Sequence, residues 1–533
     1  MTGLGRKLRR SSLPLLLAAA ASGCFMVGPD YKPPQAQVAK GWIAPEWRDA
    51  EEGVDLSAWW RTFDDSSLDR LIELAYRQNL PLEVAGLRVV EAQARRGLAI
   101  GSLFPQRQEA GGTYVRQSLS ESTATFNRLI DPNFGTWSFA ALDAAWEIDL
   151  WGKFRRGIES ADAALVGSVF NYEDVLVSLL GEVASTYVQV RVVEERLEVA
   201  ERNRDVQQRS LDIAETRFEF GAVTELDVAQ SRAQLRDTEA SIPLLTARRQ
   251  QALNTLSVLL GVPPGPLDDF MQDRSGIPAA GEDVAVGIPA ELLRRRPDVR
   301  RAERDIAVQS AKIGVAAADL YPSFQLIGSI GFEAEDFADL FTGRSFTAFG
   351  GPSVRWNILN YGRIRNNIRV QDALFQQLVV EYEDVVLRAQ REAEDAMAGY
   401  LGSRRQVDFL ADAAKSARRA VDLANLQYQE GAVDYNTVLN TQQFLLQAED
   451  RLAATRGEVD LNLVALYRAL GGGWEIRLGD DFVREGTKEN MRKRIGWGDL
   501  LDTAEQARSV EEAQSGTEGD DSWWRWRWWW PTF

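Results

Sequence analysis

The chain has 533 residues, 45% of them hydrophobic, so it can bury a large core and, by length alone, form two to four domains. Its 61 basic and 78 acidic residues leave a net charge of −17, which argues against a nucleic-acid-binding protein because such proteins present a basic surface. With no histidine and one cysteine, it lacks the commonest general base and metal ligand, and it can form neither an intrachain disulfide nor a thiolate metal cluster.

The first 23 residues have the pattern of a signal peptide. A basic start at residues 6–10 precedes a short apolar stretch at 13–21, which is shorter than the ~20 residues of a spanning helix. The lone cysteine, Cys24, comes next, and the residues before it resemble a bacterial lipobox, which implies acylation of Cys24. Phe25 stands where an aspartate would retain a lipoprotein, and this resemblance implies export to the outer membrane. An ordinary cleavage site beside a chance cysteine is the alternative.

After the signal, apolar side chains at helical spacing predict one helix over residues 67–102, which ends before Pro105. Strands are then predicted over 111–117 and 136–150. Residues 154–218 predict a single long helix, because a heptad seam runs through Leu176, Val183 and Val190 and needs a packed helical partner. At ~1.5 Å per residue this helix is ~95 Å long. The helix that returns to Gly261 contains Pro243, which should kink it.

A Gly-Ala-Val turn separates the long helix from the returning one. Gly221 suits the left-handed position that closes a helix, and Thr224 with Asp227 forms a capping box for the next helix. The same turn recurs at Gly431, 210 residues later, where Asp434 is the capping residue. Each turn is therefore predicted to be the tip of a long helical hairpin.

Other landmarks recur as well. Residues 146–153 (WEIDLWGK) correspond to 356–363 (WNILNYGR) at the same offset of 210, and residues 103–105 correspond to 320–322 at an offset of 217. These matches, in one order, indicate an internal duplication. The second copy predicts a helix over 289–319, strands over 323–332 and 345–359, and a second hairpin.

The predicted strands have the weak alternation of membrane strands. Residues 323–332 place Phe324, Leu326, Ile330 and Phe332 on one face. No stretch after the signal has 18 consecutive apolar residues, so any membrane crossing there must use strands. Four strands cannot span a bilayer with open edges, so several chains must share one barrel, and three chains would give one wide enough for an aqueous lumen. A soluble hairpin is the alternative.

The chain resembles the TolC family of outer-membrane efflux ducts, and most closely its OprM/NodT-like lipoprotein branch that serves tripartite RND pumps. The resemblance covers Cys24 to about Gly473, and its motifs are residues 28–34 (GPDYKPP), 59–68 and 288–303 (IPAELLRRRPDVRRAE). It implies a membrane α+β fold in which an internally duplicated protomer contributes four strands to a trimeric 12-stranded β-barrel and long helices to a periplasmic α-barrel. The segments expected are a lipoprotein signal (1–23), a first repeat (24–270), a second repeat (271–478) and a tail (479–533).

The resemblance implies a passive exit duct in the outer membrane, with no enzymatic chemistry, cofactor or metal. Its expected partners are two further copies of the chain, a periplasmic adaptor, an inner-membrane RND-type pump and outer-membrane lipid, but no nucleic acid. The adaptor would meet the hairpin tips, so the expected contact residues are Gly221, Thr224, Leu226, Asp227, Gly431, Asp434 and Val438. Plain helix capping is the alternative role for these residues.

Some members of the family narrow the periplasmic end with an aspartate ring and a neighbouring leucine. The matching positions here are Asn440 and Asn436, so hydrogen bonds rather than charge are expected to hold this gate closed.

Two other classes of protein are alternatives. A lipid-anchored coiled-coil scaffold or adaptor would explain the helices and Cys24, but not the repeated aromatic strand pairs. An enzyme is disfavoured because no nucleophile–base arrangement, phosphate loop or metal spacing is present in the sequence. The tail is acidic and ends in a Trp/Arg-rich run at 523–530, which suits a membrane interface or has no assigned role.

Overall fold

The computed structural model describes residues 26–39, 41–43, 56–120, 122, 133–271, 276–278 and 294–502. They belong to two compact units. The first comprises Met1–Pro34, Val90–Gly167 and Ala302–Glu381, and the second comprises Gln35–Val89, Ser168–Arg301 and Tyr382–Phe533. Each unit takes segments from both halves of the sequence, so the two repeats are intertwined. Cys24, the start of the 288–303 motif and the Trp/Arg-rich run lie outside the described residues.

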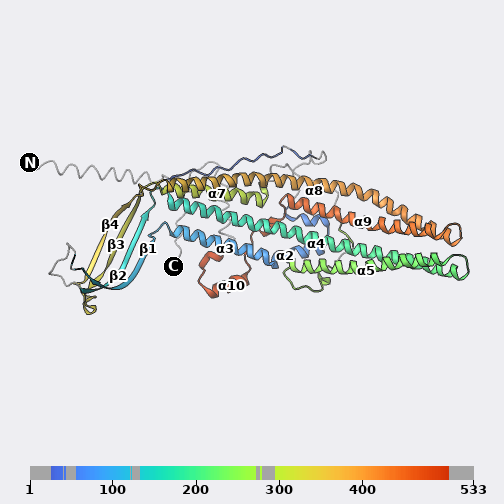
Figure 1. The fold of residues 1–533 in the computed structure, drawn as a ribbon, viewed down its shortest axis with the longest axis horizontal. Helices are drawn as coiled ribbons and strands as arrows, with labels where there is room; N and C mark the ends of the chain where they lie inside the picture. The colour runs from blue at the N-terminus through green and yellow to red at the C-terminus, as the bar shows by residue number, and fades with distance from the viewer. Residues whose placement is uncertain are drawn as a thin grey trace, which may run out of the picture. The chain divides into compact units, whose positions relative to one another are not determined.

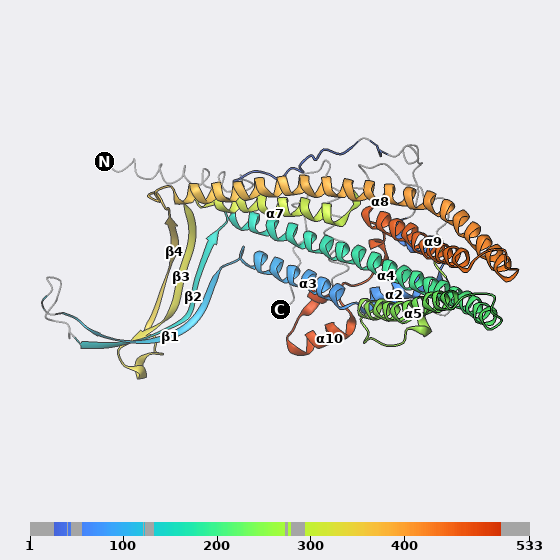
Figure 2. The ribbon, with the colours of Figure 1, turned by 45° about the vertical axis from the view of Figure 1, so that its right-hand side comes forward.

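Long helices dominate the chain (Figures 1 and 2). They are α2 (Ser66–Gln78), α3 (Leu80–Gly101), α4 (Lys153–Glu219), α5 (Glu225–Leu259), α7 (Pro297–Ala318), α8 (Arg363–Gln429), α9 (Tyr435–Ala469) and α10 (Glu485–Arg494). The paired helices of the two repeats have equal lengths, with 67 residues in α4 and α8 and 35 in α5 and α9. The two predicted hairpins are confirmed, and α5 continues through Pro243 as one helix.

Four strands form one antiparallel sheet in the first unit. They are β1 (Arg107–Ser118), β2 (Asn133–Ile148), β3 (Ser323–Ala334) and β4 (Phe346–Arg355), in the order β1-β2-β3-β4. The pairing of β2 with β3 joins the first repeat to the second. Within the described residues, β1 and β4 each pair with a strand on one side only, so each leaves an edge open.

The register gives this sheet one apolar and one polar face. One cross-strand row consists of Phe139, Phe332 and Phe346, and the same face continues through Tyr114, Trp137, Leu142, Trp146, Ile148, Phe324, Leu326, Ile330 and Val354. The opposite face carries Arg107, Glu109, Asp143, Glu147, Glu333 and Arg355. Phe324 and Phe332 are eight residues apart, or ~26 Å at ~3.3 Å per residue, which is close to the ~25 Å apolar band of membrane strands.

The duplication is visible in equivalent contacts. The Trp146 indole donates to the Leu103 carbonyl at 3.0 Å, and the Trp356 indole donates to the Leu320 carbonyl at the same distance. Three pairs of glycines 210 residues apart share left-handed backbones, with φ between 70° and 82°: Gly152 and Gly362, Gly221 and Gly431, Gly261 and Gly471. The repeated glycines therefore mark turns that both copies make in the same way.

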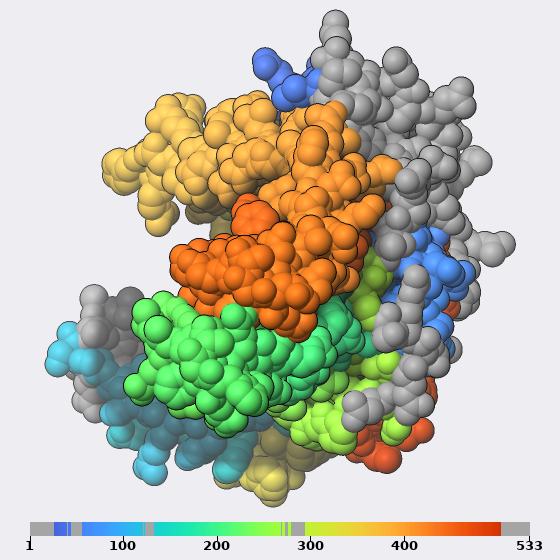
Figure 3. All heavy atoms as spheres, turned by 90° about the vertical axis from the view of Figure 1, so that its right-hand side faces the viewer, coloured from blue at the N-terminus to red at the C-terminus, as the bar shows by residue number. Residues whose placement is uncertain are grey.

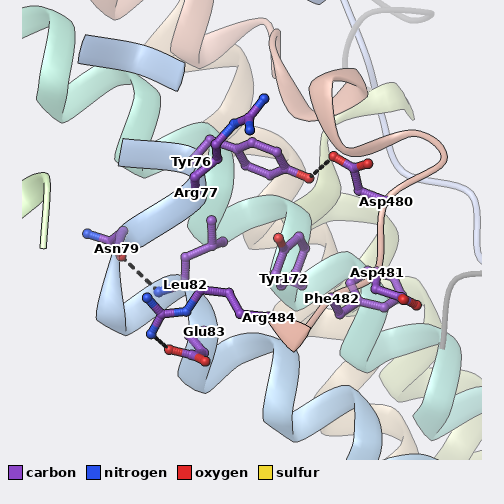
Figure 4. A pocket seen from close by; sticks show the side chains of 10 residues that line it. All are labelled: Tyr76, Arg77, Asn79, Leu82, Glu83, Tyr172, Asp480, Asp481, Phe482 and Arg484. Atoms are coloured by element: carbon purple, nitrogen blue, oxygen red, sulfur yellow. Dashed lines mark hydrogen bonds and ion pairs between the residues drawn. The ribbon is translucent and has the colours of Figure 1, made fainter. Parts of the chain in front are cut away.

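The single helix predicted over residues 67–102 is wrong, because Asn79 divides it into α2 and α3. Asn79 is extended (φ −62°, ψ 127°), and its carboxamide serves both neighbours. The oxygen accepts from the Leu82 N–H at 2.8 Å and so caps α3, as Figure 4 shows, while the amide donates to the Leu259 carbonyl at the end of α5 at 2.8 Å. The helix therefore breaks where one side chain can satisfy two helix ends.

The second repeat makes the same joint with a different side chain. The helix predicted over 289–319 is described as α7, which begins at Pro297, and residues 289–293 lie outside the described part. Arg296 donates to the Ala469 carbonyl at 2.8 Å, at the position equivalent to Leu259. Arg296 also pairs with Asp298 and Glu392, so this joint is ionic where the first is neutral.

Among the described residues, α4 is the one helix long and apolar enough to cross a membrane, but 67% of that apolar stretch is buried. Its heptad positions Leu176, Val183 and Val190 are fully buried. The apolar stretch is therefore explained by packing in the helical bundle.

Candidate functional site

The candidate functional site consists of the two hairpin turns, α4–α5 and α8–α9, which both belong to the second unit. Gly221 (φ 70°) and Gly431 (φ 74°) close α4 and α8 in the left-handed conformation. The amides that follow donate back to the helices, from Ala222 to the Arg217 carbonyl and from Ala432 to the Gln427 carbonyl, both at 2.8 Å. This is the predicted glycine closure at both tips.

The predicted caps are also present. The Asp227 carboxylate accepts from the Thr224 N–H at 3.3 Å at the start of α5. At the start of α9, Asp434 accepts from the N–H of Thr437 at 3.1 Å and from its hydroxyl at 2.8 Å. These hydrogen bonds hold the pKa of Asp434 below its usual range. Thr224, Asp227 and Asp434 therefore act as helix caps within their own hairpins.

The two tips are joined by a contact that the sequence analysis missed. Arg217, at the end of α4, donates to the Tyr428 carbonyl of α8, and its guanidinium carbon lies 4.7 Å from the Tyr428 ring centroid. The Tyr428 ring meets that of Tyr435 edge to face at 5.5 Å. Figure 3 shows the adjoining surfaces of the two turns, green for α4–α5 and orange for α8–α9. An aromatic residue shortly before each glycine was the available sequence signal.

Val438 is buried, contrary to the prediction. It was expected to contact the adaptor, but it is 0% exposed and lies in a cluster with Ala424, Tyr428 and Tyr435. Ile213 and Val223 of the first hairpin pack against the same cluster. Val438 therefore holds the two tips together and presents no surface to a partner.

Behind the tips, polar pairs connect α4 to α9. Three pairs lie in antiparallel order along these helices: Ser210 with Gln442 at 2.6 Å, Asn203 with Glu449 at 2.9 Å, and Arg196 with Asp450 at 2.7 and 3.0 Å. Ser210, Gln442 and Asn203 are at most 3% exposed. Buried polar pairs of this kind fix the register of packed helices.

The outer surface of the tips combines apolar and acidic side chains. Phe220 is 83% exposed and Leu226 is 63% exposed. Thr224, Asn436 and Asn440 are exposed, as are the acidic residues Glu219, Glu225, Glu430 and Asp434. Large exposed apolar side chains beside charges are typical of a protein-binding surface.

The pocket drawn in Figure 4 lies elsewhere in the second unit, between α2, α3 and the segment before α10. The Tyr76 hydroxyl donates to Asp480 at 3.0 Å, and Arg484 is paired with Glu83. Burial raises the pKa of the Tyr76 hydroxyl. These polar groups already bond to one another, so the pocket is explained by the docking of the C-terminal segment.

An internally duplicated chain with a two-faced antiparallel sheet and two long helical hairpins is typical of an outer-membrane channel rather than an enzyme. Comparison with known proteins agrees, because residues 71–262 and 288–472 match the family described as outer membrane efflux protein. The chain therefore belongs to the outer membrane efflux protein family, and it is the outer-membrane channel component of an efflux system.

The match to individual relatives spans nearly the whole length of each relative. The chain is 34% identical over 452 residues to the pyoverdine export outer membrane protein OpmQ of Pseudomonas putida, across 83% of this chain and 94% of OpmQ. It is 30% identical over 464 residues to nodulation protein T of Rhizobium leguminosarum bv. trifolii, across 85% and 95% of the two chains. The solved structure of the outer-membrane channel OprN has a TM-score of 0.78 and 32% identity, covering 84% of this chain and 99% of that one. The expected family, fold and channel function are confirmed.

Proposed function

We propose that three copies of the chain form one exit duct. Their sheets would close into a 12-stranded barrel in the outer membrane, with the apolar face toward lipid and the polar face toward the lumen. An open strand edge leaves backbone groups without partners in lipid, so β1 and β4 need strands from neighbouring copies. Two copies would give a barrel filled by its own side chains, whereas three leave room for an aqueous path.

This proposal is supported by a junction between the two repeats. Each chain forms this junction once, but its duplicated sequence contains the residues for a second one. Where the first repeat meets the second, the Trp151 ring stacks on Tyr321 with centroids 4.7 Å apart, and its indole donates to the Pro322 carbonyl at 2.8 Å. Lys153 pairs with Asp319 at 2.9 Å in the same place. This junction extends the pairing of β2 with β3.

Because the sequence is duplicated, Trp151 and Tyr321 each have an equivalent residue in the other repeat. The residue 210 positions after Trp151 is Tyr361, which is 96% exposed, and the residue 217 positions before Tyr321 is Phe104, which is 43% exposed. In the proposed trimer Tyr361 of one copy stacks on Phe104 of the next, extending a β4–β1 pairing in the same way. The exposed ring thus has a partner of defined chemistry in a second copy.

Crosslinking tests this assignment. Tyr361→Cys combined with Phe104→Cys, treated with a short bismaleimide, should give covalent dimers and trimers on a denaturing gel. Within one chain, β1 and β4 are three strand spacings of about 4.8 Å apart, so crosslinking inside the chain is disfavoured. The matched control, Trp151→Cys with Tyr321→Cys, should crosslink within the chain and still run as a monomer on the gel. Monomers alone from the first pair, with the control reacting, would refute the assignment.

We further propose that an adaptor protein docks on the tips and connects the duct to an inner-membrane RND-type pump. The exposed Phe220 and Leu226 lie among acidic side chains, so the complementary surface presents apolar and basic groups. Asn436 and Asn440 would hold the periplasmic end closed through hydrogen bonds between copies. Acylated Cys24 would add a lipid anchor after removal of residues 1–23.

The cargo would be small molecules chosen by the pump. Relatives of similar identity carry names as different as pyoverdine export protein and toluene efflux pump outer membrane protein. A duct that serves such different cargo needs a polar lumen rather than a binding site. Export assays that combine this channel with different inner-membrane pumps would test this. The compound that is exported should change with the pump and not with the channel.

A further inference from the structure

The loop between β3 and β4 folds back onto the apolar face of the sheet. It comprises residues 335–345, follows Ala334 and leads into Phe346, and it appears as the gold turn at the end of these strands in Figure 2. Phe337 of this loop meets the Trp137 ring edge to face at 5.0 Å. Phe341 meets the rings of Phe139 and Phe332 at 5.5 and 5.7 Å. Because these three partners share the apolar face, the loop covers that face and not the polar one.

The loop has a defined conformation. A short 3-10 turn spans Phe337–Asp339, and the Asp339 carbonyl accepts from the N–H and hydroxyl of Thr342 at 3.2 and 2.9 Å and from the Ser345 hydroxyl at 2.7 Å. The Glu333 N–H donates to the Ser345 carbonyl at 2.8 Å, which extends the ladder into the loop. These bonds fix where the two phenylalanines stand.

Both phenylalanines nevertheless remain largely uncovered. Phe337 is 58% exposed and Phe341 is 60% exposed, whereas Leu340 between them is 3% exposed. Glu335, Asp336 and Arg344 of the same loop are exposed as well. Aromatic rings continuous with an apolar sheet face, beside charged groups, have the composition of a membrane interface.

We propose that this loop is a membrane-interface foot, in which Phe337 and Phe341 enter the boundary between headgroups and acyl chains of the outer leaflet. The inference rests on the proposed placement of the apolar face in lipid. The two loop rings then lie against Trp137, Phe139 and Phe332 of the apolar face, so this loop does not cover the face that is proposed to line the lumen. Lipid is the occupant because the loop continues a surface already assigned to lipid.

Depth-dependent fluorescence quenching tests the proposal. Phe341→Cys in the full chain is labelled with a thiol-reactive nitrobenzoxadiazole dye and reconstituted into phosphatidylcholine vesicles containing lipid with a nitroxide at a shallow or a deep acyl carbon. The shallow nitroxide should quench this dye several-fold more than it quenches a dye at Phe349→Cys on the polar face. The unsubstituted chain, labelled in parallel, gives the background from Cys24, the only native cysteine.

Dyes at two further positions separate a failure of the loop placement from a failure of the sheet placement. Ile330→Cys lies on the apolar face within β3 and should be quenched best by the deeper nitroxide. Gly343→Cys keeps both phenylalanines, and a Cβ added at Gly343 would meet no atom within 4 Å, so this variant reports on the loop even if Phe341→Cys fails to fold. Quenching at Ile330→Cys with none at the loop positions would overturn the foot, whereas no quenching at Ile330→Cys would overturn the placement of the sheet itself.

Discussion

Arg217 is one of the side chains through which the first hairpin contacts the second at the tips. It donates to the Tyr428 carbonyl and covers the Tyr428 ring at 4.7 Å. Replacing it with alanine, Arg217→Ala, removes both contacts and leaves the packing of Val438 and Tyr435 in place. We therefore expect the variant to fold normally but to release the α8–α9 tip more often.

The size of the effect follows from the two contacts. A hydrogen bond from a charged donor contributes about 1.5–3 kcal/mol, and a partly exposed cation–π contact contributes about 0.5–1 kcal/mol. Solvent screening and the entropy of fixing a long side chain offset part of this sum, which leaves about 1–2 kcal/mol for local opening. At 1.4 kcal/mol per factor of ten, the opened population should rise roughly 5- to 30-fold.

Hydrogen exchange of the backbone around Tyr428 and Val438 measures that population directly. Exchange there should accelerate by this factor, and conductance in planar bilayers should rise because the closed end is loosened. The matched control is Arg232→Ala, which removes a guanidinium paired with Glu215 inside the first hairpin, at 2.8 Å. That exposed pair contributes ~0.2–1 kcal/mol and should leave conductance unchanged. Unaltered exchange near Tyr428 in Arg217→Ala would refute the role of Arg217.

Three further outcomes are expected. Cys24→Ala should lose fatty-acid label in metabolic labelling, and equal label in both proteins would exclude Cys24 as the anchor. Gly221→Pro combined with Gly431→Pro forbids φ values of 70° and 74°, because proline fixes φ near −65°. Trimers of this variant should persist, while efflux and crosslinking to an adaptor should be lost. Full efflux by the variant would exclude the docking role of the two turns. Asn436→Ala with Asn440→Ala should raise conductance, and unchanged conductance would place the seal in packing between helices.

The sequence was sufficient for features that repeat or depend on local chemistry. The strands, the long helices and the glycine turns were predicted because periodicity and turn residues act over a few positions. Two further features depended on distant partners. The break at Asn79 depends on the Leu259 carbonyl, 180 residues away, and the burial of Val438 depends on contacts with the other hairpin.

Strand register shows the same limit. A bulge between Ala140 and Leu142 inserts one residue in β2, so simple alternation would assign the wrong face to every residue beyond it. Only the pairing of β2 with β3 shows that Leu142 and Ile330 share the apolar face. The Arg217 contact with Tyr428 has the same limit, because the aromatic residues before each glycine mark the two tips but do not show which residues of the two hairpins meet.

The stacking of Trp151 on Tyr321 also bears on how quickly the duct assembles. A ring of six equivalent units would need five separate association steps if each unit were its own chain. Fusing the units in pairs makes half of the contacts intramolecular, so they form at the effective concentration of a tethered partner when each chain folds. In the proposed trimer only two association steps remain, because the last of the three contacts between chains closes the ring within the assembled trimer. The duplication thus lowers the kinetic order of assembly and shortens the time during which open strand edges can pair with the wrong neighbour.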